Sequence, residues 1–199
     1  MPRIAVLAMQ GDFAEHIEAL KKLGSDAIEA RTPADIDSAD GIIIPGGEST
    51  TMTRLMKEYG LWESVRQAHS KGKAIWGTCA GMIIASRSIV GQDKPQETLG
   101  ILDIDTQRNA YGRQLDSFEE NIQSSALKGG PFHAVFIRAP IIRRVGSKVE
   151  VMARSANGSP IAVQDGNVLA TSLHPELTND TRFHAYFLTL LNKNKIVRS

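Results

Sequence analysis

The first half of the chain alternates short apolar runs with segments of helical periodicity, and this alternation restricts the fold more than any other feature. Strands are predicted at residues 3–8, 26–30, 41–44 and 74–77. Helices are predicted at residues 13–23, 50–71 with a break at Gly60, and 82–88. Strands that alternate with helices form crossover units, which build a parallel sheet covered on both faces. The apolar run at 42–44 supports this, because a strand buried on both faces does not alternate with polar residues.

The second half has a more β-like character. Strands are predicted at residues 132–138 and 148–155, and a hairpin closed at Asp165-Gly166 joins 160–164 to 168–172. A polar loop is expected at 91–97 and a final helix at 181–192. With 199 residues, the chain is expected to form a single domain, residues 1–199. The predicted fold is three-layer α/β, with a mostly parallel central sheet, helices on both faces and a β-rich second half.

Composition excludes several classes of protein. The formal net charge is +1, and the short stretch with Arg138, Arg143 and Arg144 is interpreted as ordinary strand and turn charge, so no nucleic-acid partner is expected. The longest uncharged stretch, residues 74–86, is shorter than the roughly 20 residues of a membrane span, so no membrane association is expected. A single cysteine and the absence of a signal-peptide pattern indicate a cytoplasmic protein.

That cysteine lies in a sequence that favours chemistry. Cys79 is the centre of Gly-Thr-Cys-Ala-Gly at residues 77–81, between a predicted buried strand and a predicted helix. Small residues on both sides suit the sharp strand-to-helix turn of a nucleophile elbow. The helix N-terminus favours a thiolate, and the N–H of Ala80 can face a developing oxyanion. A free cysteine elsewhere would be interpreted as a small buried apolar residue, but the flanking glycines favour a nucleophile.

A thiol nucleophile needs a base, and His174 is the best placed of five histidines. It follows a predicted strand that Pro175 ends, and Glu176 stands two residues later, where its side chain points the same way and can orient the imidazole. Of the remaining histidines, His16 is expected on the surface side of the first helix. His69, His133 and His184 are expected to have structural roles. No His, Cys, Asp and Glu set has metal-ligand spacing, so neither a metal nor a cofactor is expected.

Paired glycines form the third element of the predicted site. Gly46 and Gly47 directly follow the buried strand at residues 41–44. Such a pair is often only a turn, but it lets the backbone approach a ligand closely. Ligands of parallel sheets bind at the carboxyl ends of the strands, so the pair is expected beside Cys79. The N–H of Gly47 could then complete an oxyanion hole with Ala80.

These residues resemble a known family. The cysteine motif at 77–81 together with His174-Pro175-Glu176 resembles the triad-type, or class I, glutamine amidotransferases. Within them, the chain is most similar to the glutaminase subunits of pyridoxal 5′-phosphate synthase. That resemblance is carried by the blocks at residues 6–16, 44–51, 108–114 and 136–140, and it spans nearly the whole chain.

The resemblance implies a role for each matching residue. Cys79 attacks the amide of L-glutamine, His174 acts as base and then acid, and Glu176 orients His174. Backbone groups of Gly47 and Ala80 hold the oxyanion. The implied substrate-binding residues are Gly46, Gly47, Glu48, Arg108, Ile137 and Arg138. A guanidinium such as Arg108 suits the α-carboxylate of glutamine, and a carboxylate such as Glu48 suits its α-ammonium.

The resemblance also implies a partner. The ammonia would pass through a channel into a separate (β/α)8-barrel synthase, which builds pyridoxal 5′-phosphate (vitamin B6) from a pentose phosphate and a triose phosphate. Twelve copies of each chain would form the complex.

Three other interpretations remain open on the sequence. One is a different amidotransferase subunit, such as that serving imidazole glycerol phosphate synthesis. The second is a cysteine peptidase or chaperone of related α/β fold, and the third is a non-catalytic module that gates ammonia.

Overall fold

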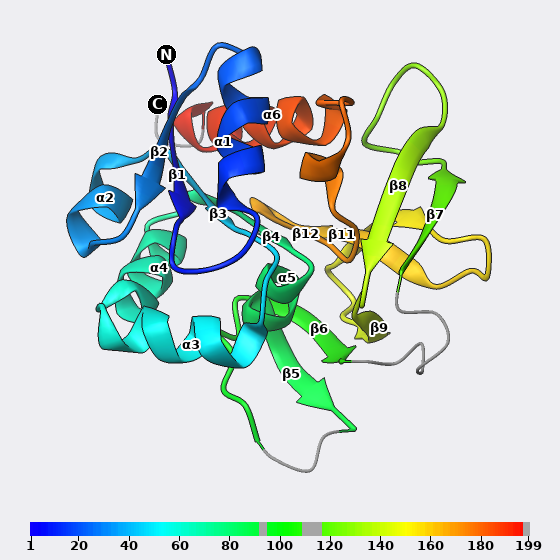
Figure 1. The fold of residues 1–199 in the computed structure, drawn as a ribbon, viewed down its shortest axis with the longest axis horizontal. Coiled ribbons are helices and arrows are strands. Elements are labelled where there is room, and N and C mark those ends of the chain that lie inside the picture. Colours follow the sequence, from blue (N-terminus) through cyan, green and yellow to red (C-terminus); the bar gives the residue numbers. More distant parts are fainter. Residues whose placement is uncertain (92–94, 109–116, 197–199) are drawn as a thin grey trace.

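The computed structural model describes residues 1–91, 95–108 and 117–196, and it confirms the predicted α/β fold (Figure 1). A seven-stranded sheet crosses the molecule in the order β10-β11-β12-β4-β3-β1-β2. The five strands from β12 to β2 pair in parallel, and β11 pairs antiparallel with both β12 and β10. The strands of this sheet are β1 (Arg3–Leu7), β2 (Asp26–Ala30), β3 (Gly41–Ile44), β4 (Ala74–Thr78), β10 (Glu150–Arg154), β11 (Pro160–Asp165) and β12 (Val168–Thr171).

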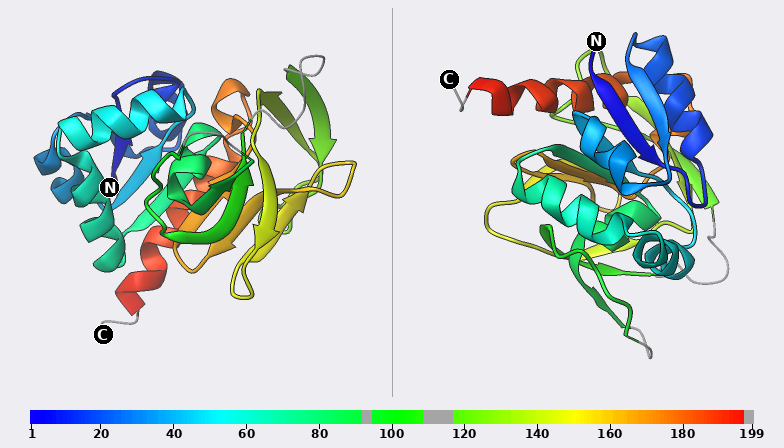
Figure 2. Two further views of the ribbon diagram at one scale, coloured as in Figure 1. Left: turned by 90° about the horizontal axis from the view of Figure 1, so that it is seen from below. Right: turned by 90° about the vertical axis from the view of Figure 1, so that its left-hand side faces the viewer.

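Helices cover both faces of the sheet, as Figures 1 and 2 show. Alternate residues of β1 enter two separate cores: Ile4 and Val6 pack with α1 and α6, whereas Ala5 and Leu7 pack with α2, α3, α4 and α5. From Ile4 to Leu7 the strand is therefore apolar, because it is buried on both sides. The helices are α1 (Phe13–Lys22), α2 (Pro33–Ser38), α3 (Ser49–Glu58), α4 (Leu61–Ser70), α5 (Ala80–Ala85) and α6 (Arg182–Ile196), with a 3-10 turn η1 (Pro175–Leu177).

The predicted break at Gly60 is confirmed. Gly60 has φ 74°, a left-handed conformation that glycine adopts without steric cost, and it separates α3 from α4. Helix α2 was not predicted, although Thr32 and Asp35 form a capping box at its start.

The second half adds strands outside the main sheet. They are β5 (Ser86–Val90), β6 (Leu102–Gln107) and β9 (Ile141–Val145) in one small sheet, and β7 (Ser117–Ile122) with β8 (Phe132–Ile137) in another. The predicted helix at 82–88 is wrong in its second part. Helix α5 ends at Ala85, and Ser86 begins a strand that pairs in parallel with β6. That pairing is non-local, so local periodicity could not show it.

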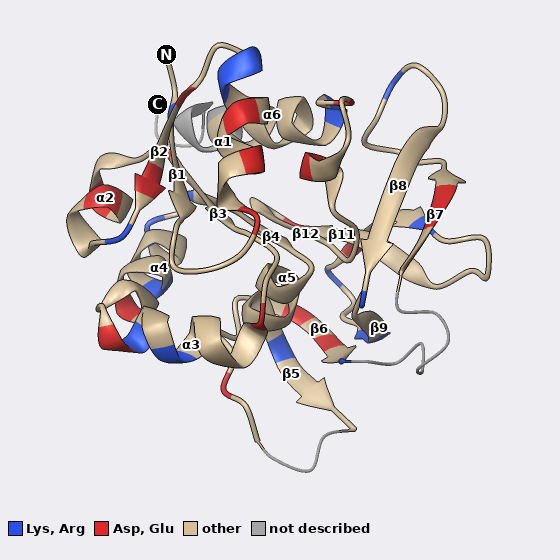
Figure 3. Cartoon of the chain, in the orientation of Figure 1, with Lys and Arg blue, Asp and Glu red and all other residues tan. Residues whose placement is uncertain are grey.

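The predicted hairpin is confirmed, since β11 pairs antiparallel with β12. Of the predicted loop at 91–97, residues 92–94 lie outside the described residues, and the rest contains neither helix nor strand. Figure 3 shows acidic and basic residues interspersed along both halves of the chain. Among the described residues, no helix combines the length and apolar character needed to cross a membrane.

Candidate active site

The carboxyl ends of four parallel strands meet at one edge of the main sheet, and the loops that leave them build the site. The loop after β1 carries Gln10 and Asp12, and the loop after β3 carries Gly46 and Gly47. The loop after β4 begins at Cys79, while His174 and Glu176 follow β12. Segments far apart in the sequence thus converge because the topology places their strand ends together.

Cys79 occupies a sharp turn between β4 and α5. Its φ of 48° and ψ of −104° are unusual for a residue other than glycine, as expected at a nucleophile elbow. Its N–H donates to the carbonyl of Thr171 on the neighbouring strand, 2.8 Å away. A side chain on Gly81 would overlap the carbonyl of Ile44, and one on Gly77 would lie 2.5 Å from the backbone of Gly81. The two glycines are therefore required for the helix to pack against the strands.

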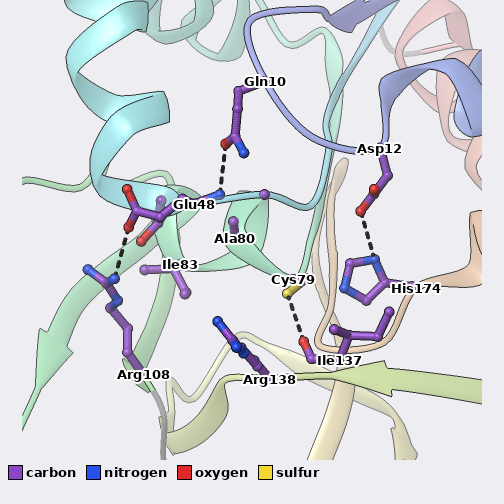
Figure 4. A pocket seen from close by; sticks show the side chains of 12 residues that line it. Gln10, Asp12, Glu48, Cys79, Ala80, Ile83, Arg108, Ile137, Arg138 and His174 are labelled. Atoms are coloured by element: carbon purple, nitrogen blue, oxygen red, sulfur yellow. Dashed lines mark hydrogen bonds and ion pairs between the residues drawn. The ribbon is translucent and has the colours of Figure 1, made fainter. Parts of the chain in front are cut away.

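The imidazole of His174 lies beside this cysteine. Its Nδ1 is 2.7 Å from Oε1 of Glu176. Its Nε2 is buried and has no hydrogen-bond partner among the described residues, which leaves that nitrogen free to exchange a proton with the sulfur of Cys79. The thiol points across the pocket toward the carbonyl of Ile137, with an Sγ to O distance of 3.8 Å (Figure 4).

Asp12 is a site residue that the sequence analysis missed. Its Oδ2 lies 3.3 Å from Nδ1 of His174, so two carboxylates approach one ring nitrogen. Burial opposes a charge on His174, but Asp12, the thiol of Cys79 and Glu176 together raise its pKa well above the ordinary value. The hydrogen bond to His174 in turn lowers the pKa of Asp12. The position of Asp12 after the first parallel strand was the signal that could have revealed it.

Glu176 lies behind the imidazole, away from the pocket, with a fully buried carboxylate. Desolvation raises its pKa, and the adjacent His174 counters that effect. On its other side stands His16, which was expected on the surface and is instead completely buried. That expectation was wrong because His16 stands one helical turn before Leu20 and shares its core-facing side of α1.

The glycine pair closes the pocket beside the imidazole. A side chain on Gly46 would lie 2.5 Å from Cε1 of His174, and one on Gly47 would lie 2.7 Å from Oε1 of Gln10. The same oxygen of Gln10 accepts a hydrogen bond from the N–H of Glu48 at 2.8 Å (Figure 4). Gln10 is thus a second residue that the sequence analysis missed, and it holds the glycine loop in place.

The pocket enclosed by these loops has a volume of about 470 Å³. It is lined by residues of both halves of the chain: Gln10, Asp12, Gly47, Glu48, Ser49, Cys79, Ala80, Ile83, Arg108, Ile137, Arg138 and His174. Of the predicted site residues, Gly46 and Glu176 support the pocket without lining it. In the block predicted at 108–114, only Arg108 belongs to the described residues.

Glu48 and Arg108 form a charged pair on the wall opposite the imidazole. Nη2 of Arg108 lies 3.0 Å from Oε1 of Glu48, and Nη1 contacts Thr50 and Gln96. Glu48 also caps α3 by accepting hydrogen bonds from the N–H groups of Thr50 and Thr51. Burial raises the pKa of Glu48. The hydrogen bonds from Thr51 and, to a smaller extent, from Thr50 outweigh this effect and lower the pKa to about 2. The carboxylate is therefore ionised at neutral pH.

Asp12, His174 and Glu176 also offer three ligand atoms within 4.8 Å of one another, a grouping that sequence spacing did not anticipate. Both carboxylates approach the same Nδ1 of His174. A proton on that nitrogen is a hydrogen-bond donor that both carboxylates can face.

The fold and the site together define a class I glutamine amidotransferase. The chain belongs to the SNO glutamine amidotransferase family, whose model matches residues 6–193. It is 53% identical to pyridoxal 5′-phosphate synthase subunit PdxT of Thermus thermophilus, over 94% of this chain and 96% of that protein. It is 47% identical to the PdxT subunit of Dehalococcoides mccartyi, over 97% and 99%.

Solved structures agree. A crystal structure of a glutamine amidotransferase superposes with a TM-score of 0.88 at 49% identity, covering 95% of this chain and 98% of that one. The PurLQS structure from Thermotoga maritima has a TM-score of 0.70 at 17% identity and shows the fold alone. The predicted resemblance to the amidotransferases of pyridoxal 5′-phosphate synthesis is confirmed. Family membership also excludes the peptidase and the imidazole glycerol phosphate alternatives.

Proposed function

We propose that this chain hydrolyses L-glutamine to L-glutamate and ammonia, and that the ammonia serves pyridoxal 5′-phosphate synthesis. One observation carries the proposal. A cysteine on a strained elbow, an imidazole held by a buried carboxylate and a glycine-lined backbone loop all face one pocket, whose far wall carries a guanidinium and a carboxylate.

The reaction follows from these positions. The thiol of Cys79 gives its proton to Nε2 of His174, and the sulfur attacks the amide carbon of glutamine. The negative oxygen of the tetrahedral intermediate is held by the N–H groups of Gly47 and Ala80. The carbon–nitrogen bond then breaks, the proton passes from His174 to the leaving nitrogen, and ammonia departs from a glutamyl thioester. Water, deprotonated by His174, cleaves the thioester and restores the thiol.

The anionic surroundings of His174 suit the second half of this sequence. Because its pKa is raised, the imidazolium persists at neutral pH and can protonate the leaving nitrogen. Glu176 holds the ring by its Nδ1, so that Nε2 faces the sulfur.

Glutamine would lie with its amide at Cys79 and its amino-acid end toward the far wall. Arg108 would bind the α-carboxylate, and Glu48 the α-ammonium, with Gly46, Gly47, Ile137 and Arg138 completing the site. The pair between Arg108 and Glu48 supports this arrangement, because two opposite charges side by side match the two charges of a free amino acid.

The relatives are named as subunits of pyridoxal 5′-phosphate synthase, which supports a separate synthase subunit as partner. We propose the (β/α)8-barrel synthase, in a complex of twelve and twelve, as the acceptor of ammonia. Residues 1–199 are proposed to act as one glutaminase domain, because both halves contribute to the pocket. A cytoplasmic location is supported by the need to keep the single thiol reduced.

The experiment is a transfer of isotope. The chain is combined with a barrel synthase subunit, the two sugar phosphates and glutamine labelled with ¹⁵N in its amide. The proposal predicts that ¹⁵N appears in pyridoxal 5′-phosphate, and that excess unlabelled ammonium in solution dilutes it little. Production of glutamate without labelled cofactor would contradict the role in cofactor synthesis, while the absence of glutamate would contradict the glutaminase itself.

A further inference from the structure

Two completely buried histidines lie behind the proposed triad, and neither lines the pocket. His16 comes from α1 and His184 from α6. Their rings pack edge-on against Trp76, with centroid distances of 5.5 Å for His16 and 4.9 Å for His184. Burial holds the pKa of both rings below the ordinary value, so both are neutral and each carries one ring proton.

The two rings form a chain that ends at Glu176. Nδ1 of His16 is 2.9 Å from Nε2 of His184. Nε2 of His16 is 3.2 Å from the hydroxyl of Thr78 and 3.4 Å from Oε2 of Glu176. This second oxygen of Glu176 is buried and forms no well-aligned hydrogen bond with any described residue, so the nitrogen of His16 is the polar group that faces it.

The buried contacts fix where the ring protons lie. If His16 carried its proton on Nδ1, its Nε2 lone pair would face the carboxylate, and the Nδ1–H of His184 would be buried without an acceptor. With the proton of His184 on Nε2, that group donates to Nδ1 of His16. The Nε2–H of His16 then donates to the hydroxyl of Thr78 at 3.2 Å and lies beside Oε2 of Glu176 at 3.4 Å. Of the four ring nitrogens, Nδ1 of His184 is then the one without a partner among the described residues, and an unpaired lone pair costs less than an unpaired buried N–H.

We propose that His16 is a positioning residue, which places its Nε2–H, oriented by His184, against Glu176 and so keeps that carboxylate ionised and aimed at His174. The proposal rests on the glutaminase function proposed above. An ionised Glu176 is needed whenever His174 carries its proton, and this carboxylate is fully buried, where an unassisted charge is unfavourable. His16 does not line the pocket, so its loss should affect turnover and not substrate binding.

A purely packing role for His16 is the competing explanation. A comparison of His16→Gln with His16→Asn distinguishes it from the positioning role. His16→Gln keeps an amide N–H close to the place of Nε2. His16→Asn has the same chemistry, but its amide ends near the place of Nδ1 and cannot reach Glu176. His16→Leu fills the space without any donor. The matched control is His133→Leu, since His133 is exposed and pairs with Glu119 on the β7–β8 hairpin.

Each variant is assayed for glutamine hydrolysis in the presence of the synthase subunit, and its thermal unfolding is recorded. His16→Asn and His16→Leu should lower kcat by about 10- to 100-fold, because the buried charge of Glu176 loses the polar group that faces it, with KM for glutamine within about twofold of wild type. His16→Gln should retain kcat within about threefold. His133→Leu should change neither constant.

Equal kcat values for His16→Asn and His16→Gln, whether normal or reduced, would overturn the proposal in favour of packing. This comparison holds even if His16→Leu fails to fold. A rise in KM with kcat preserved would also overturn it. The proposed function fails separately, since in that case the wild-type chain itself would release no glutamate in the same assay.

Discussion

The two sides of the pocket are built in different ways. The reactive side, with Cys79, His174 and Gly46, comes from the ends of strands that are buried in the main sheet, and close backbone packing fixes it. The opposite side, with Arg108 and Arg138, follows strands β6 and β8 of the two small sheets, and exposed or half-exposed side chains form it. Under the proposed function, chemistry therefore depends on rigid packing, and substrate recognition depends on side-chain charge.

The largest effect is expected on the reactive side, for Gly81→Ala. The added methyl group overlaps the carbonyl of Ile44, and backbone atoms cannot yield as a flexible side chain can. The free energy of unfolding should fall by about 3 kcal/mol or more, measured by urea denaturation. Gly158→Ala is the control, because there is space for a methyl group at Gly158. This variant should lose only about 1 kcal/mol of unfolding free energy, since alanine adopts the φ of 83° less readily than glycine does. Equal losses in the two variants would show that the elbow is not tightly packed.

On the recognition side, Arg108→Ala should act on binding. Loss of the guanidinium proposed to bind the α-carboxylate should raise KM for glutamine by about 10- to 100-fold, with a much smaller change in kcat. Initial rates across a range of glutamine concentrations measure both. Arg143→Ala serves as control, since Arg143 on β9 contacts Gln107 and does not line the pocket. A fall in kcat alone would break the division between the two sides.

Asp12→Asn should shift the pH dependence of turnover. Burial lowers the pKa of His174, and the hydrogen bond to Asp12 is the largest single contribution that raises it, so removal of Asp12 lowers that pKa. The imidazolium that protonates the leaving nitrogen is then lost at lower pH, and the alkaline limb of the kcat profile should move to lower pH. The distant, exposed Asp37→Asn should leave the profile unchanged. An alkaline limb that stays in place or moves upward would contradict the assignment of Asp12.

The smallest effect concerns stability at the recognition side. Glu48→Ala removes the cap of α3 and should cost about 1 kcal/mol of unfolding free energy at pH 7. The folded pKa of Glu48 is about 2, below the unfolded value of 4.5, so its contribution is present above pH 4.5 and is lost as pH falls toward 2. Urea denaturation of wild type and variant should therefore converge in acid. The control is Glu58→Gln at the other end of α3, which keeps the cap and should lie within about 0.5 kcal/mol of wild type at pH 7.

The sequence predicted the reactive side better than the recognition side, for physical reasons. Local periodicity and glycine placement suffice for β3, β4 and the elbow, and the rule that parallel strands end at one edge brings Cys79 and Gly47 together. By contrast, β5 was mistaken for helix because only its distant partner β6 makes it a strand. His16 was misplaced because a histidine on a helix was assumed to face water, although its spacing to Leu20 put it in the core.

Gln10 and Asp12 lie in the block at residues 6–16 that carries the family resemblance, but the resemblance assigned neither of them a role at the site. Each is significant only for what it touches, His174 in one case and the N–H of Glu48 in the other. Contacts of this kind arise from tertiary structure, so local periodicity does not show which residues make them. Applying the strand-end rule to the first strand as well as the third and fourth would have drawn attention to both.

The most direct test of the account concerns the sulfur of Cys79. Wild-type chain and Cys79→Ala are each mixed with glutamine in the presence of the synthase subunit, and acid-quenched samples are examined by mass spectrometry while glutamate is measured in parallel. The account predicts a glutamyl adduct on the peptide that contains Cys79 in wild type, and no adduct and no glutamate release above background in Cys79→Ala. Glutamate release by Cys79→Ala at the wild-type rate would contradict it.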